Sequence, residues 1–200
     1  MSLVAGRNIN ELLAALGEEL VLMGAAPIEL CLIGGSALAL LGLVERPTKD
    51  IDVVALVESS GGVLRVRSAS PLPDVLVRAC AEVATQQGID PNWLNSGPAR
   101  LLDWGLPDGF ETRLVKRSYG PCLVIHLASR LDQICFKAYA AADVAGRHLS
   151  DLQILSPTGE EMRFAFAWVI RQDSSVGFRT QLEQMADYLG VRDVLDAIER

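Results

Sequence analysis

The 200-residue chain is poor in cysteine and has no long apolar run, and both shortages exclude classes of protein. Its four cysteines are scattered and form no Cys-x-x-Cys pair, which argues against a zinc site or a disulfide framework. The longest nearly continuous apolar stretch, residues 30–44, is shorter than a membrane span, and a secretory signal is missing. We therefore expect a cytoplasmic protein with reduced, buried thiols and no membrane association.

Positive charge is also scarce. Eighteen Lys and Arg against twenty-five Asp and Glu give a net charge of −7, and the basic residues form only small groups. A surface that binds duplex DNA needs clustered Lys and Arg to neutralise the phosphates, so extended duplex binding is not expected. Binding of a small nucleotide through a metal ion is compatible with an acidic protein.

Half of the residues are hydrophobic, and their spacing predicts strands and helices first and helices only later. The expected elements are a helix to residue 23 opened by a capping box at Asn8–Glu11, strands at 28–33, 50–57 and 63–67, helices at 36–43 and 73–87, a hairpin of 110–117 and 121–128, and helices at 129–142, 158–171, 176–189 and 191–199. This order predicts an α/β (α+β) fold: a mixed-sheet core over 1–128, with a helical region over 129–200 packed on it.

Two aspartates begin the second expected strand. Asp50 and Asp52 are two positions apart, so a strand would project both carboxylates from one face, with their Cα atoms about 6.5–7 Å apart. Such a pair suits one or two hard cations. The alternative is a solvated pair of acids at a strand edge, which would repel each other without a compensating charge.

Gly34, Gly35 and Ser36 stand where the first expected strand passes into a helix. Glycines let a backbone approach a ligand closely, and helix N-terminal amides favour phosphate. The Ser36 hydroxyl could cap the helix or bind a phosphate oxygen. The motif is neither a Walker loop nor a Gly-x-Gly-x-x-Gly fingerprint, which excludes a Rossmann interpretation.

The spacing brings the two motifs together, because Asp50 follows Ser36 by fourteen positions, enough for one short helix and a return loop. Two adjacent strands would then place the glycine turn beside the carboxylates. Just before Asp50, the Arg46 guanidinium could reach a phosphate and Thr48 could orient an acid. Their alternatives are a surface arginine and a strand-initiating threonine.

Two segments of the chain together resemble the signature of the DNA polymerase β-like nucleotidyltransferase superfamily. They are Ile33-Gly-Gly-Ser-Ala-Leu38 and Arg46-Pro-Thr-Lys-Asp-Ile-Asp52. More narrowly, the chain resembles the minimal bacterial nucleotidyltransferases and the abortive-infection-type nucleotidyltransferase toxins. The similarity extends over residues 28–178 and suggests an uncharacterised bacterial branch. Its later elements are Trp93-Leu-Asn95, Lys137, Arg147-His-Leu-Ser-Asp151 and Pro157-Thr158-x-x-Glu161.

The resemblance implies that Gly34, Gly35 and Ser36 contact the triphosphate of an NTP, and that Asp50 and Asp52 ligate Mg²⁺ or Mn²⁺. A nucleoside monophosphate would pass to the hydroxyl of a protein side chain, an RNA end or a small molecule, and pyrophosphate would leave.

Active members of the superfamily generally carry a third carboxylate on a later strand. Glu111, in the first strand of the expected hairpin, is the best candidate, and its alternative is a solvent-facing strand residue; Asp103 and Asp108 are weaker. The second strand offers only His126, which we interpret as a core histidine. Without a third acid, the chain is instead an inactive nucleotide-binding or regulatory module. Such a module would act in a toxin–antitoxin or phage-defence pair with a small antitoxin-like partner.

Lys137 lies in an expected helix among apolar residues. Its ammonium group would snorkel to water, reach the phosphates or pair with Asp151. Trp93 and Trp104, in the long segment 90–109, would stack on a base or, more commonly, anchor the loop.

Overall fold

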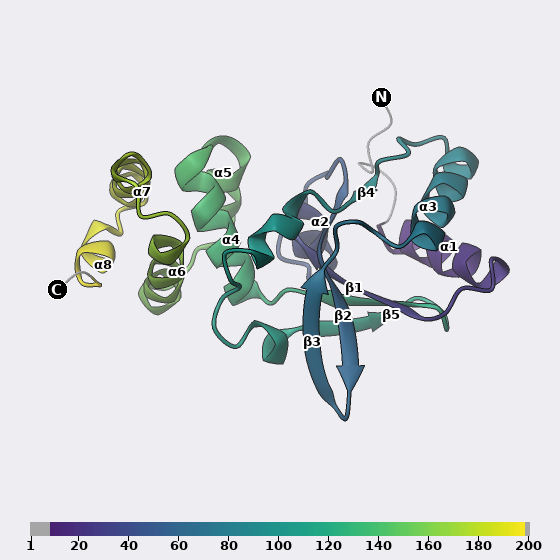
Figure 1. The fold of residues 1–200 in the computed structure, drawn as a ribbon. Coiled ribbons are helices and arrows are strands. Elements are labelled where there is room, and N and C mark those ends of the chain that lie inside the picture. Colours follow the sequence, from purple (N-terminus) through teal and green to yellow (C-terminus); the bar gives the residue numbers. More distant parts are fainter. Residues whose placement is uncertain (1–8, 199–200) are drawn as a thin grey trace. The chain divides into compact units, whose positions relative to one another are not determined.

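The computed structural model describes residues 9–198, so Asn8 of the expected capping box lies outside the described residues. Backbone contacts divide the chain into two compact units. The sheet unit holds the described residues up to Trp104 together with residues 111–128, and the helical unit holds residues 105–110 and the described residues from Ser129 onward. Figure 1 shows the elements of both.

The sheet unit is built on a mixed sheet, which confirms the expected α+β class. Its strands run in the order β3-β2-β1-β6-β5, and β4 pairs with β2. The pairs β1–β2, β2–β3 and β5–β6 are antiparallel, whereas β1–β6 and β2–β4 are parallel. The strands are β1 (Ile28–Ile33), β2 (Ile51–Ser60), β3 (Val63–Ser68), β4 (Leu94–Asn95), β5 (Val115–Ser118) and β6 (Leu123–Leu127).

Helices α1 (Ile9–Leu22) and α3 (Asp74–Gln87) pack against this sheet, beside one another in Figure 1. Alternate strand residues point to the same face, so Leu30 and Leu32 of β1 join Ile125 of β6 in one apolar core with the leucines of α1. A short helix, α2 (Gly34–Leu40), follows β1 directly. The guanidinium of Arg117 on β5 donates to the carbonyl of Leu40 at 2.6 Å and so holds the end of α2.

The expected strand over 110–117 was wrong in its first half. Residues Phe110–Arg113 form a 3-10 helix, η2, and β5 begins only at Val115. The physical reason is a turn: the Phe110 N–H donates to the Pro107 carbonyl, and the buried Phe110 ring anchors the segment. The segment expected to be irregular, 90–109, also contains β4 and a second 3-10 helix, η1 (Gly97–Leu102).

The turn between β5 and β6 lies against α1 at Gly17. An added Cβ on Gly17 would lie 2.0 Å from the Tyr119 carbonyl oxygen, closer than any real contact. The Tyr119 hydroxyl also donates to Asn10 Oδ1 at 2.6 Å. A side chain at position 17 would therefore push the backbone of the turn away from the helix.

The helical unit contains α4 (Arg130–Asp143), α5 (Gly146–Leu155), α6 (Gly159–Gln172), α7 (Val176–Leu189) and α8 (Arg192–Asp196). Two of these helices begin at capping boxes, at the positions where the sequence predicts helices to start. Ser129 and Asp132 cap α4, and Thr158 and Glu161 cap α6. Residues 105–110 belong to this unit, because the Trp168 indole donates to the Gly105 carbonyl at 3.0 Å and Arg171 pairs with Asp108 at 3.2 Å.

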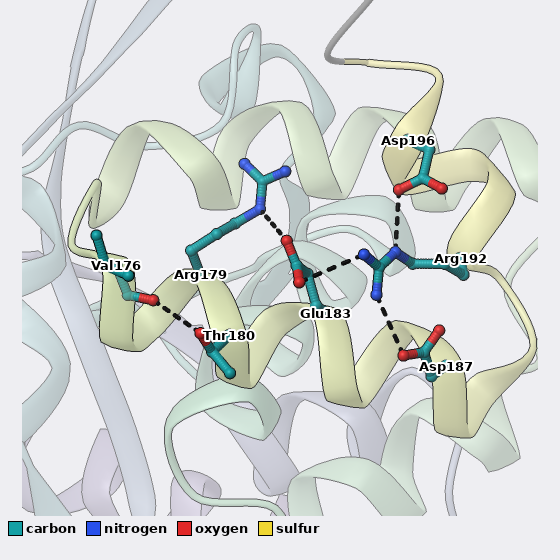
Figure 2. A network of polar contacts seen from close by, with 7 residues as sticks. All are labelled: Val176, Arg179, Thr180, Glu183, Asp187, Arg192 and Asp196. Atoms are coloured by element: carbon teal, nitrogen blue, oxygen red, sulfur yellow. Dashed lines mark hydrogen bonds and ion pairs between the residues drawn. The ribbon is translucent and has the colours of Figure 1, made fainter.

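Arg192 contacts three carboxylates, two of which lie on α7 and connect α8 to it (Figure 2). Its guanidinium contacts Glu183 at 3.3 Å and Asp187 at 3.1 Å on α7, and Asp196 at 2.9 Å on α8 itself. Arg179 contacts the same Glu183 at 3.0 Å, one helical turn away. The pairs form a network, which stabilises more than isolated surface pairs do.

All four cysteines are free, as the sequence predicts, and burial raises the pKa of the Cys80 thiol to about 12. That thiol stays protonated, and hence unreactive, at neutral pH. No helix within residues 9–198 has the length and apolar character that crossing a membrane requires.

We expect Gly17→Ala to lower the free energy of unfolding by about 1–3 kcal/mol, because overpacking displaces the backbone at Tyr119. Urea denaturation measures the loss. Gly177→Ala is the matched control, since a Cβ on this helical glycine meets nothing within 4 Å. Equal stability of the two variants would contradict the close packing of Gly17 against the Tyr119 carbonyl.

Candidate functional site

Strand pairing brings the glycine turn and the aspartates together at one end of the sheet. Strand β1 ends at Ile33 and passes directly into α2 at Gly34. Because β1 and β2 are antiparallel, the carboxyl end of β1 lies beside the amino end of β2, and Ile33 pairs with Asp52. The juxtaposition expected from the spacing of the two motifs is thus present.

The two glycines let polar side chains approach the start of α2 closely. Gly34 has a φ of +77°, and an added Cβ there would lie 2.8 Å from Asp52 Oδ2. An added Cβ on Gly35 would lie 3.1 Å from Thr48 Oγ1 and 3.2 Å from Arg46 Nη2. A carboxylate, a hydroxyl and a guanidinium therefore surround a backbone segment that has no side chains of its own.

The loop before β2 carries Arg46 and Thr48, and both side chains bond to nearby backbone. Thr48 is nearly buried, and its Oγ1 donates to the Asp50 carbonyl oxygen at 3.1 Å, so it holds the Asp50 backbone. Arg46 Nη1 donates to the Pro47 carbonyl at 3.2 Å while its guanidinium lies against Gly35. Neither residue is a plain surface residue.

Asp50 lies one residue before the strand on which we expected it. The ladder begins at Ile51, whose N–H donates to the Trp93 carbonyl at 2.6 Å, whereas Asp50 ends the preceding loop. Asp52 is on β2, and both aspartates are half-buried. The pair therefore combines one acid on the loop with one on the strand.

Ser36 is fully buried, and its Oγ has no hydrogen-bond partner among residues 9–198. It is the third residue of α2, whose N-cap is Ile33 with no side-chain cap, so the interpretation of Ser36 as the cap was wrong. A buried polar group without a partner costs about 1–3 kcal/mol. The hydroxyl is thus a buried donor and acceptor that the described residues leave unused.

Asn95 was not singled out for a role by the sequence, although it ends the Trp93-Leu-Asn95 motif. Strand β4 runs parallel to β2, and Asn95 pairs with Asp52. Its Nδ2 donates to Asp52 Oδ1 at 3.4 Å, and its Oδ1 accepts the Gly97 N–H at 2.9 Å. In the sequence, the one feature that could have indicated a role for Asn95 is its place as a polar residue at the end of a short apolar stretch.

Asp50 and Asp52 are the residues that could hold a magnesium ion together with a bound ligand. Mg²⁺ is commonly held by one or two carboxylates together with substrate phosphates and waters. Asp50 and Asp52 supply such carboxylates. Within residues 9–198, no group of three or more His, Cys, Asp and Glu side chains is placed to hold a metal by itself.

The other candidates differ in the elements on which they lie. Glu111 is on η2 and not on a strand. His126 is buried, as expected of a core histidine, and its Nε2 lies 2.6 Å from Glu29 Oε2. The Trp93 side chain is buried and donates to the Cys80 carbonyl at 3.0 Å, so it anchors the core, whereas Trp104 is half exposed.

Lys137 on α4 pairs with Asp151 on α5, which was one of the expected alternatives. Nζ lies 2.8 Å from Oδ2, and the two side chains are only 5% and 0% exposed. Removing one member of a buried pair leaves the other charge uncompensated. The pair therefore fixes α4 against α5.

We expect Lys137→Met to lower the free energy of unfolding by about 3–5 kcal/mol, because Asp151 would remain charged and buried. Asp108→Asn is the control in the same unit: it breaks the exposed pair with Arg171 and should cost less than about 1 kcal/mol. Denaturant titration distinguishes the two. A loss in Lys137→Met no larger than in the control would show that the buried pair is not required for stability.

Comparison with known proteins adds no identification. No family model matches the chain, and no curated protein or solved structure matches it either. The function must therefore be inferred from the geometry of the site itself.

Proposed function

We propose that the protein is a Mg²⁺-dependent nucleotidyltransferase that moves a nucleoside monophosphate from an NTP to a hydroxyl acceptor. The observation that carries this proposal is the pairing of Ile33 with Asp52, which places the Asp52 carboxylate beside the two glycines that begin α2. Phosphates and a divalent cation need these two features next to each other.

The start of α2 supplies groups suited to the triphosphate. Gly34 and Gly35 carry no side chains where Asp52, Thr48 and Arg46 approach α2, and the Ser36 hydroxyl has no partner within the described residues. Arg46 brings a planar guanidinium to the same place, and this group matches phosphate geometry. Together they would bind and orient the triphosphate.

Asp50 and Asp52 would hold the cation, which, when bound, neutralises charge on the phosphates and orients them for in-line attack. The acceptor hydroxyl would lose its proton to water, its oxygen would form a bond to the α-phosphorus, and the bond between the α-phosphorus and the bridging oxygen would break, so that pyrophosphate leaves. Thr48 contributes by fixing the backbone of Asp50. The acceptor is a protein side chain, an RNA end or a small molecule; extended duplex DNA does not suit a chain with a net charge of −7.

A second function is a nucleotide-binding regulatory module, with a small antitoxin-like protein as its partner. The observation that favours it is the position of Glu111 on η2, away from the strands that carry a third carboxylate in the superfamily it resembles. The start of α2 and the Ser36 hydroxyl, which has no partner within the described residues, would serve nucleotide binding without transfer equally well.

Transfer is tested with each NTP labelled at the α-phosphate, using the protein itself, RNA and a cell extract as acceptors. We expect Asp50→Ala and Asp52→Asn to lower labelling about 100-fold or more, because the phosphate charge is no longer neutralised. Glu82→Gln, an exposed acid on α3, is the control and should label normally. Labelling that persists in both aspartate variants would remove these acids from the mechanism.

Binding is tested separately by calorimetry with a non-hydrolysable NTP. Ser36→Ala should weaken nucleotide affinity about 10- to 100-fold, because a hydrogen bond to a charged phosphate is lost. The same variant should be at least as stable as wild type without nucleotide, since the buried hydroxyl has no partner to lose. Unchanged affinity would exclude Ser36 from the site, whereas binding without any transfer would support the regulatory module.

A further inference from the structure

Asn95 lies beside Asp52 on the side of β2 opposite to the glycine turn. In the sheet β2 has β1 on one side, and on the other it has β4, whose Asn95 is the register partner of Asp52. Strand β4 consists of two residues only, so its pairing with β2 ends at Asn95 itself. This short strand places one polar side chain beside the carboxylate.

The orientation of the Asn95 amide is set by Gly97. The Gly97 N–H donates to Asn95 Oδ1 at 2.9 Å, which identifies the oxygen and turns the NH₂ group toward Asp52 Oδ1, 3.4 Å away. An added Cβ on Gly97 would lie 3.0 Å from that same Oδ1. A glycine at position 97 therefore permits the close approach that fixes the amide.

The Asn95 amide contacts Asp52 on one side, and Gly34 leaves room for it on the other. Asp52 Oδ1 faces Asn95 Nδ2, whereas Oδ2 lies 2.8 Å from where a Cβ at position 34 would stand, a place that glycine leaves empty. The contact with Asn95 restricts the rotation of the carboxylate. The amide provides a donor without adding a second negative charge, which an acid at the same place would do.

We propose that Asn95 is a positioning residue, which orients the Asp52 carboxylate toward a divalent cation through the contact that Gly97 fixes. The inference rests on the proposed function, because it assigns Asp52 to the metal site. Groups that hydrogen-bond to a metal ligand restrict its orientation, and their loss commonly lowers metal affinity about 10- to 100-fold.

The experiment uses Mn²⁺ as a spectroscopic probe on the full chain, with affinity measured by electron paramagnetic resonance and melting temperature measured with and without the ion. Asn95→Ala should weaken Mn²⁺ binding about 10- to 100-fold. Asn95→Asp should instead increase the stabilisation that Mn²⁺ gives. A carboxylate at position 95 still accepts the Gly97 N–H but repels Asp52, so the variant should melt lower without metal and gain more from Mn²⁺ than wild type does.

Two controls separate the possible failures. Asn92→Ala removes a nearby exposed asparagine whose side chain makes none of these contacts, and it should bind Mn²⁺ as wild type does. Asp52→Asn should lose binding; if it does not, the proposed metal site itself is wrong. If Asp52→Asn loses binding while Asn95→Ala keeps wild-type affinity, only the role of Asn95 is overturned. If Asn95→Ala does not fold, the Asn95→Asp variant tests the proposal instead. A melting temperature that rises with Mn²⁺ by the same amount as in wild type would then overturn the role of Asn95.

Discussion

The candidate site depends on the antiparallel pairing of β1 with β2. The register sets Ile33 opposite Asp52, so the residue that ends one strand adjoins the acid at the start of the other. A slip of one residue would turn Asp52 to the opposite face of the sheet and away from the start of α2. The apolar core enforces this register, because Leu30 and Leu32 of β1 and Leu56 of β2 must stay buried against α1 and α3.

Beside this strand pair, two glycines allow side chains to approach the start of α2 closely. Gly34 and Gly35 are the places where Asp52, Thr48 and Arg46 come closest to α2, and any larger residue would occupy the space in which these groups meet. At the other end of α2, Arg117 of β5 bonds to the Leu40 carbonyl. The sheet therefore holds α2 in place, while the buried Ser36 hydroxyl has no partner in the part of the chain that the structure describes. An unpaired buried hydroxyl lowers stability by about 1–3 kcal/mol.

Local sequence patterns predicted the parts of the molecule whose structure is decided by neighbours in the chain. The capping boxes at Ser129 and Thr158, and the strand that ends at the glycine pair, follow from residues three or fewer positions apart. The errors arose where distant segments decide. Phe110 belongs to a turn anchored in the helical unit and not to a strand, and β4 exists only because β2 offers it a partner.

The sequence by itself determined which chemical groups the candidate site contains: the glycine turn, the two aspartates, Arg46, Thr48 and Ser36 are all recognisable from residue type and spacing. Only the tertiary structure decided what each group does there. Thr48 bonds to the backbone of Asp50, Lys137 pairs with Asp151, and Asn95 lies beside Asp52. Ser36 has no partner within the described residues. The physical reason is that hydrogen bonds and ion pairs act over a few ångströms, and residues 43 positions apart, such as Asp52 and Asn95, reach that distance only through the sheet.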